Sequence, residues 1–196
     1  MEEYKLIIDY PNYEVSNYGN VRNKTTGCIL HENKNHYGYI YCHLKNVDGD
    51  FNKLQNHRLV ALSFIKNPLQ KPYVDHINNN KNDNNLNNLR WATPSENQQN
   101  HSISKANTSG VKGISFDKKR NKWRVSIQID GINYNLGRFM TLEEAKQARI
   151  KSVNAIFGEF TNKCEKLPPK IRLKSTVKLF KTIDDLLNEI NQLIHL

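Results

Sequence analysis

The sequence predicts an α+β protein with a β-rich first module, a strand-strand-helix unit, a three-stranded antiparallel sheet packed on one helix, and a C-terminal helix. Three observations predict this class. Residues 39–44 and 122–129 alternate apolar and polar side chains, which is the period of half-buried strands. Gly, Asn and Asp between such segments suit tight turns. Thr93 and Thr141 are each followed three residues later by Glu, a pattern that opens helices.

The first module is expected to cover residues 1–55. Its strands are separated by three glycines, Gly19, Gly27 and Gly38. A short helix is expected to begin at His57, and its apolar residues should brace the segment that follows. We interpret His57 as structural, because a His at the start of an apolar helix is more often packed than ligating; a ligand role is the alternative.

The next unit contains a pattern of polar residues that can build a metal-dependent site. Tyr73 and Val74 run into Asp75-His76, an Asn-rich turn follows, and a second short apolar segment ends at Trp91. The four residues from Thr93 to Glu96 then fit a capping box with Pro at the first helical position. A hairpin followed by a helix would let Asp75, His76 and Asn97 converge.

This segment resembles the HNH, or ββα-metal, nuclease motif of phage and intron-encoded homing endonucleases, through Asp75-His76, Asn88, Leu89-Arg90-Trp91 and Glu96-Asn97. The resemblance implies that Asp75 and Asn97 hold one divalent cation, Mg²⁺ or Mn²⁺, as suits oxygen ligands. It also implies that His76 is the general base and that Asn88 orients the His76 ring. The sequence departs from the family at Asn78-Asn79, where Asp-Gly is common, and at Asp83, where Asn is usual.

The residues before the nuclease segment resemble the small β-rich DNA-binding module that precedes the HNH motif in homing endonucleases. The resemblance lies in residues 12–30, 38–46 and 57–68. Four basic side chains of this part could follow a DNA backbone or form an ordinary charged surface: Arg22, Lys24, Lys34 and Lys45.

Residues 109–161 predict a second compact fold. Residues 113–116, 122–129 and 132–136 have strand patterns, and turn signals separate them. A helix is expected after Thr141, ending at Gly158, with small residues that allow close approach to the sheet. On the middle strand, one set of alternating side chains is apolar and the other is polar.

This part resembles the three-stranded DNA-binding domain of plant ethylene-response factors, which also occurs in phage HNH endonucleases. The matching positions are Trp123, Leu136-Gly137, Phe139, residues 141–145 and Gly158. A polar sheet face can enter a major groove, and lysines and arginines around it can contact phosphates; a solvated face of a half-buried sheet is the alternative. The expected DNA-binding residues are Lys112, Ser115, Lys118, Lys119, Arg120, Lys122, Arg124, Ser126, Gln128, Asn133, Asn135 and Arg138.

The predicted organisation is therefore a module at 1–55, a nuclease at 56–101, a linker at 102–108, a DNA-binding domain at 109–163, and a Pro-containing linker with an amphipathic helix at 164–196. The apolar stripe of this last helix, behind Thr182, predicts packing on the preceding domain, with self-association as the alternative. We expect a monomer on DNA, with a dimer through this helix as the alternative.

Composition narrows the class of protein. The 196 residues carry a net charge of +10, and residues 102–196 contribute most of it, with 18 Lys and Arg against 9 Asp and Glu, compared with 11 against 10 in residues 1–101. This asymmetry favours a polyanion partner for the C-terminal half. The three widely spaced cysteines form neither a disulfide framework nor zinc-ligand spacing. Without a signal-like start or a bilayer-spanning segment, we expect a cytoplasmic protein, of a bacterial host if it is phage-encoded.

Together these patterns predict a site-specific HNH homing-type DNA endonuclease that acts on double-stranded DNA with one divalent metal and nicks one strand. Two alternatives belong to other classes: a non-catalytic DNA-binding regulator with a decayed nuclease module, and a structural or partner-binding protein with a basic surface. All four site residues of the motif are present, which disfavours the first alternative.

Overall fold

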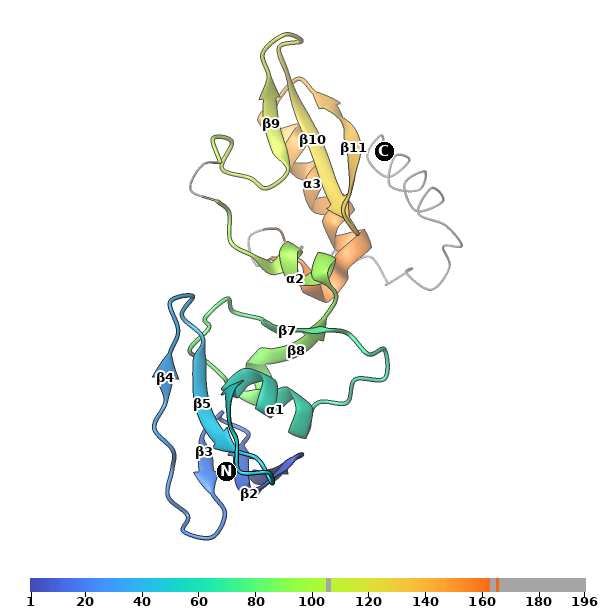
Figure 1. The fold of residues 1–196 in the computed structure, drawn as a ribbon. Coiled ribbons are helices and arrows are strands. Elements are labelled where there is room, and N and C mark those ends of the chain that lie inside the picture. The colour runs from blue at the N-terminus through green and yellow to red at the C-terminus, as the bar shows by residue number, and fades with distance from the viewer. Residues whose placement is uncertain (105–106, 163–164, 166–196) are drawn as a thin grey trace. The chain divides into compact units, whose positions relative to one another are not determined.

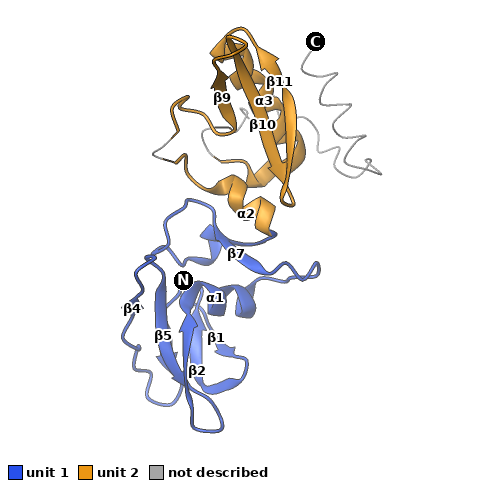
Figure 2. Ribbon diagram, turned by 45° about the horizontal axis from the view of Figure 1, so that its top comes forward, with its two compact units in different colours: residues 1–93 blue, residues 94–196 orange. Residues whose placement is uncertain are grey.

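The computed structural model describes residues 1–104, 107–162 and 165. It divides into two compact units, residues 1–93 and 94–196, each of which is described by itself (Figure 2). Both units combine small antiparallel sheets with few helices, so the prediction of an α+β protein is confirmed.

The first unit contains three small sheets and one helix (Figure 1). The strands pair in the orders β1-β2-β3, β4-β5-β6 and β7-β8, all antiparallel. The short helix starts beside His57, as predicted. The elements are β1 (Tyr4–Ile7), β2 (Tyr10–Ser16), β3 (Val21–Asn23), β4 (Asn33–Lys34), β5 (Ile40–Lys45), β6 (Phe51–Gln55), α1 (Asn56–Phe64), β7 (Tyr73–His76), the 3-10 helix η1 (Leu86–Asn88) and β8 (Leu89–Ala92).

One hydrophobic core contains side chains from all of these elements except β4. Val15 of β2, Leu44 of β5, Val60 of α1 and Trp91 of β8 belong to the same cluster. Cys42 is buried in it as a small apolar side chain, and burial raises the pKa of its thiol to about 12. The sequence suggested a boundary between a module at residues 1–55 and a nuclease segment that begins at residue 56. In the structure, residues on both sides of that boundary belong to the same core.

The second unit packs one long helix on a three-stranded sheet. The sheet has the order β11-β10-β9, and α3 covers one of its faces (Figure 1). The elements are α2 (Pro94–Asn100), β9 (Ile114–Asp117), β10 (Lys122–Ile129), β11 (Ile132–Phe139), α3 (Leu142–Phe157) and the 3-10 helix η2 (Gly158–Phe160).

Local sequence signals explain α3. The Thr141 side chain accepts a hydrogen bond from the Glu144 amide, and the Glu144 carboxylate accepts from the Thr141 amide, so the predicted capping box is formed. The helix ends at Gly158, whose φ of +50° lies in the left-handed region. Ala145 and Ala148 are buried against the sheet, as expected for residues that allow close approach.

A β-bulge in β11 keeps the polar side chains of the sheet on one face. The register shifts between Val125 and Ser126 of β10, so that Ser126 pairs with Asn135 while Arg124 pairs with Arg138. A bulge inserts one residue and reverses the alternation beyond it. Arg138 therefore shares a face with Asn135, although the two residues are three positions apart and would lie on opposite faces of a regular strand.

Helix α2 makes its polar contacts within the second unit. Ser95 Oγ donates to Asp130 Oδ1 at 2.8 Å, and the Asp130 amide donates back to Ser95 Oγ at 2.7 Å. The Gln98 side chain bonds to Gln128, and α2 also contacts η2. The sequence assigned this helix to the nuclease segment at 56–101, whereas the boundary between the units precedes it at Thr93.

Within the described ranges, no helix is long and apolar enough to cross a bilayer. The predicted C-terminal helix, the Pro-containing linker and Cys164 lie outside the described residues.

Candidate active site and nucleic-acid interface

The β7-β8 hairpin holds the two central residues of the predicted nuclease site. Asp75 and His76 end β7, opposite Arg90 and Leu89 of β8, and both side chains are buried. Tyr73, at the start of the same strand, is exposed. The hairpin thus directs a carboxylate and an imidazole from adjacent positions into the interior of the first unit.

Asp75 is paired with Arg90 across the hairpin. The Asp75 Oδ2 atom accepts from Arg90 Nε at 2.9 Å and lies 2.8 Å from Arg90 Nη2. Both nitrogens lie on one edge of the planar guanidinium and approach the same carboxylate oxygen, so the positive charge of Arg90 lies directly against Asp75. The sequence resemblance contained Arg90 but gave it no role, because pairing depends on the strand register.

The Asn-rich loop between η1 and β7 is held by its own amides. Asn88 Oδ1 accepts from the Asn78 amide at 3.0 Å, and Asn88 Nδ2 donates to the Asp83 carbonyl at 2.8 Å. Asn79 has a φ of +62°, so it occupies the left-handed conformation in which the family commonly places Gly. The Asn88 side chain therefore connects the start of the loop, at Asn78, to its later part, at Asp83.

The His76 ring is contacted by Asn84. Its Nε2 atom lies 3.1 Å from Asn84 Oδ1, and both side chains are buried. The prediction that Asn88 orients this ring was wrong, because the Asn88 side chain bonds to the loop backbone instead. Whether Asn88 is a catalytic residue stays a prediction.

Two further rings border His76. The His57 ring centroid lies 4.9 Å from that of His76, and the Tyr39 centroid lies 6.0 Å from it. Burial lowers the pKa of His57 to about 3, helped by the proximity of His76 and Arg58, so His57 is neutral at physiological pH. Burial also lowers the pKa of His76, while Asn84 and the charge of Asp75 oppose that shift. His76 is thus available as a neutral proton acceptor.

The predicted metal ligands lie in different units. Asp75 is in the first unit, whereas Asn97 is on α2 of the second, so their convergence stays a prediction. Among the described residues, no group of three or more His, Cys, Asp or Glu could hold a metal ion by itself. A carboxylate and an amide fit a Mg²⁺ or Mn²⁺ ion that keeps several waters and takes phosphate oxygens as its other ligands.

The polar face of the second unit's sheet is assembled as predicted. Direct cross-strand pairs join Gln128 to Asn133, Ser126 to Asn135, and Arg124 to both Arg138 and Ser115. Part of this face lines a hollow of about 310 Å³. On the opposite face, Val125, Ile127 and Ile129 are buried, which confirms the predicted alternation.

Basic residues surround the β9-β10 end of this face. Lys118, Lys119 and Arg120 are exposed in the connecting turn, and Lys122 begins β10. Asp117 Oδ2 lies 3.2 Å from Arg120 Nη1 and 3.3 Å from Arg138 Nε, so one carboxylate holds two arginines beside the sheet. Asp117 therefore positions the two arginines, and both lysines are exposed.

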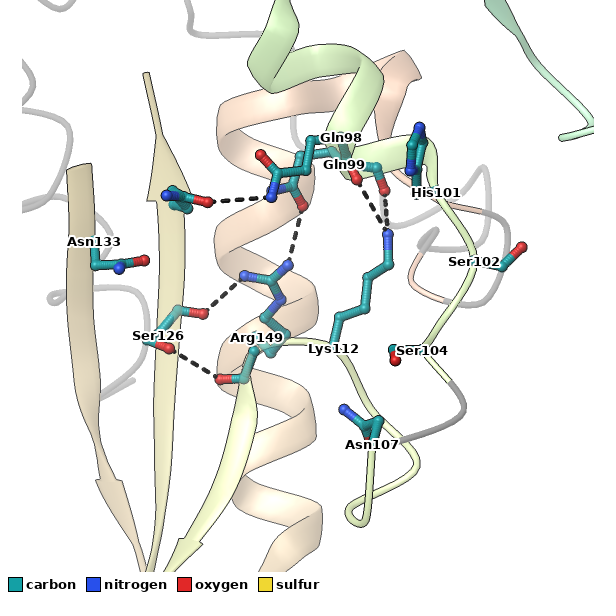
Figure 3. Close-up of a pocket in the computed structure, with 12 residues that line it drawn as sticks. Gln98, Gln99, His101, Ser102, Ser104, Asn107, Lys112, Ser126, Asn133 and Arg149 are labelled. Carbon is teal, nitrogen blue, oxygen red and sulfur yellow. Dashed lines mark hydrogen bonds between the residues drawn. The ribbon is translucent and has the colours of Figure 1, made fainter. Parts of the chain in front are cut away.

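Several other expected DNA-binding side chains, Gln128 and Lys112 among them, also make contacts inside the unit. The Gln128 amide bonds to Gln98 and to the Gly131 carbonyl. Lys112 Nζ donates to the Gln99 carbonyl at 2.7 Å, at the C-terminal end of α2 (Figure 3). Both line a polar cavity of about 370 Å³ between α2, α3 and the sheet. The alternation of β10 placed Gln128 on the polar face of the sheet, but the sequence did not predict the hydrogen bonds of Gln128 or Lys112.

Arg149 is the buried centre of this region. It donates to Gln99 Oε1 and to the Ser126 carbonyl, both at 3.0 Å (Figure 3). Its Nε also donates to Glu165 Oε1 at 3.1 Å. Nothing in the sequence analysis pointed to Arg149. A helical Arg in a basic segment has no sequence signal that separates a buried network from a solvated surface.

Comparisons with known proteins match the first unit and most of helix α2, which follows it. Residues 2–45 match the model of the NUMOD4 motif, and residues 56–99 match that of the HNH endonuclease family. An uncharacterized HNH endonuclease of Acanthamoeba polyphaga mimivirus is 48% identical over 92 residues, 46% of this chain and 23% of that protein. Protein 3.8 of Escherichia phage T7 is 37% identical over 86 residues, 43% of this chain and 71% of that protein.

The chain spans only 23%, 33% and 59% of the lengths of three mimivirus relatives that are each named uncharacterized HNH endonucleases. A solved structure of the HNH homing endonuclease I-HmuI, described for its DNA binding and cleavage, is 29% identical, with a TM-score of 0.48 over 80% of this chain and 91% of that one. The family match covers the hairpin that carries Asp75 and His76, and most of the phage protein aligns with this chain. The chain therefore belongs to the HNH endonuclease family.

Proposed function

We propose that this chain is a site-specific, homing-type DNA endonuclease that hydrolyses one phosphodiester bond with the help of one divalent metal ion. The observation that carries the proposal is the buried hairpin pair, in which Arg90 orients Asp75 and Asn84 contacts a neutral His76. A decayed nuclease module would have no need to keep both contacts in its interior, so the alternative of a non-catalytic regulator is less well supported.

His76 is the proposed general base. A neutral imidazole beside the scissile phosphate takes a proton from water as the water oxygen attacks phosphorus. Asp75 and Asn97 would hold the cation, which when bound neutralises charge on the phosphate and on the leaving 3′ oxygen. The expected products are a 3′-hydroxyl and a 5′-phosphate.

The second unit is the proposed site-reading part. Its polar sheet face offers Arg, Asn and Ser side chains to base edges, and its exposed lysines offer charge to phosphates. The resemblance to the ethylene-response-factor domain supports this use of the sheet. The excess of positive charge in residues 102–196 supports it independently.

The first experiment tests the chemistry. The purified full chain is incubated with DNA from its own genomic neighbourhood in Mg²⁺, in Mn²⁺ or in EDTA, with separate labels on the two strands. We expect cleavage only with a divalent metal, ends that ligase can rejoin, and a nick in one strand by a monomer. Full activity in EDTA would contradict the metal assignment, and paired cuts by a dimer would contradict the nickase assignment alone.

A second experiment tests the DNA-reading face by changing charge alone. The double substitution Lys118→Gln with Lys119→Gln should reduce the slope of log affinity against log salt by about 1.8, because each phosphate contact contributes about 0.9. Binding is measured by fluorescence anisotropy at several salt concentrations.

The matched control removes the same charge from the helix on the other side of the sheet, with Lys146→Gln and Lys151→Gln in α3. This control should leave the slope close to that of the unchanged protein. Equal slopes for the two double variants would show that attraction is not localised to the β9-β10 turn.

A further inference from the structure

The turn between β2 and β3 lies directly against the end of the Asn-rich loop that connects β7 to η1. Gly19, in this turn, has a φ of +94°, and a Cβ atom there would come within 2.5 Å of the Asn84 Cβ. The Leu86 amide donates to the Asn17 carbonyl at 2.7 Å, next to the same contact. The absence of a side chain at position 19 therefore allows the loop to approach at Asn84.

This turn is a rigid support. Ser16 is fully buried, and its Oγ accepts from the amides of Tyr18 and Asn20. The Asn56 side chain donates to the Gly19 carbonyl at 3.1 Å, which ties the turn to the start of α1. Residues from the module that matches NUMOD4 thus fix the place of a residue in the HNH segment.

Asn84 in turn has a definite electrostatic effect on His76. Only 4% of Asn84 is exposed, and its Oδ1 faces His76 Nε2 at 3.1 Å. An amide oxygen accepts hydrogen bonds and cannot donate them. The contact is favourable only when Nε2 carries the ring proton, which leaves the lone pair on Nδ1.

We propose that Asn84, held in place by the Gly19 turn, is a positioning residue that keeps the proton of neutral His76 on Nε2 and so makes Nδ1 the proton-accepting atom. The proposal rests on the proposed function of His76 as the base. In the reaction, the water oxygen bonds to phosphorus as the bond from phosphorus to the 3′ oxygen breaks. The water proton goes to Nδ1, and solvent supplies a proton to the 3′ oxygen.

The same contact also supports the charged form of the ring. Once Nδ1 has taken the proton, the ring is positive, and the hydrogen bond from Nε2 to Asn84 becomes charge-assisted and therefore stronger. An acceptor on Nε2 fixes the tautomer before the reaction and stabilises the imidazolium after it, as a carboxylate does in hydrolases with a Ser-His-Asp triad. The N-terminal module would then support catalysis as well as any DNA contact it makes.

The test reads the tautomer directly, by nitrogen-15 NMR of the imidazole of His76 in the full chain without DNA. We expect the unchanged protein to have the proton on Nε2. The variant Asn84→Asp keeps an acceptor and should keep this tautomer, whereas Asn84→Leu should give a mixture of the two. The control is Asn82→Leu, the same substitution at an exposed position of the same loop, and it should change nothing.

Alanine substitutions at two glycines test whether the turn at Gly19 holds Asn84 in place. Gly19→Ala should displace Asn84 and give the same mixture of tautomers as Asn84→Leu. Gly27→Ala is the control, because Gly27 also has a positive φ, of +70°, but a Cβ there meets nothing within 4 Å. Any loss of stability common to the two alanine variants comes from backbone strain, and only Gly19→Ala should alter His76.

Single-turnover cleavage gives the second measurement. Asn84→Leu should cleave about 10- to 100-fold more slowly with unchanged DNA affinity, and Asn84→Asp should recover most of that loss. A proton on Nδ1 in the unchanged protein, or an unaltered tautomer in Asn84→Leu, would overturn the inference. If no variant cleaves DNA, the proposed function fails, and the NMR result still decides the role of Asn84.

Discussion

Replacing His76 by alanine should slow single-turnover cleavage by about 10²- to 10⁴-fold, the usual contribution of a general base. DNA affinity should stay within a few-fold of the unchanged protein, because a base acts in the transition state and adds little to ground-state binding. Affinity is measured in Ca²⁺ and the cleavage rate in Mg²⁺ or Mn²⁺, on the same DNA.

Because His76 is buried, the variant needs a check on folding. Thermal unfolding and the salt dependence of DNA binding serve this purpose. A large drop in the unfolding temperature together with a loss of DNA binding would indicate a folding defect. His31→Ala, at an exposed position of the first unit, is the control and should cleave normally. A folded His76→Ala variant that cuts at the normal rate would show that the base has been assigned to the wrong residue.

The second large effect is expected on stability. Arg90→Met should lower the free energy of unfolding of the first unit by about 3 kcal/mol, because it leaves the Asp75 carboxylate buried without its cation. The Asp75 side chain is 3% exposed and that of Arg90 is 13% exposed, so solvent can replace little of the lost interaction.

The measurement is urea unfolding followed by Trp91 fluorescence, in a Trp123→Phe background that makes Trp91 the single tryptophan. The control is Arg22→Met, which breaks the more exposed pair with Glu14 and should cost less than about 1 kcal/mol. Adding Asp75→Asn to Arg90→Met should restore at least half of the loss, since no buried charge remains. No restoration would mean that Arg90 stabilises the unit by packing and not by charge.

Local patterns were enough to predict most elements of the fold. Alternation predicted β5 and β10, and a reciprocal cap predicted the start of α3, because these signals depend on residues near one another in the chain. The bulge in β11 was not predicted, although Gly137 stands beside it. A bulge depends on the register with β10, and one strand's sequence does not contain that register.

The candidate site was predicted in its residue types and less well in its contacts. Asp75 and His76 were singled out because their order is specific, and both lie on β7. Asn88 was expected to orient the His76 ring, whereas Asn84 contacts that ring in the structure. Several asparagines follow His76, and each could reach its ring in some conformation of the loop. The turn at Gly19 selects one of them, and no pattern within the loop contains that contact.

The polar contacts of α2 have a consequence for exchanging parts between members of this family. A chimaera joined at residues 102–108, where the sequence suggests a linker, would keep α2 but discard Asp130, Gln128 and Arg149, its partners in the second unit. The C-terminal part taken from the other protein would have to provide new hydrogen-bond partners for Ser95, Gln98 and Gln99. A junction after Thr93 transfers the helix together with the sheet that it contacts, so the better point at which to join two such chains lies one helix before the predicted linker.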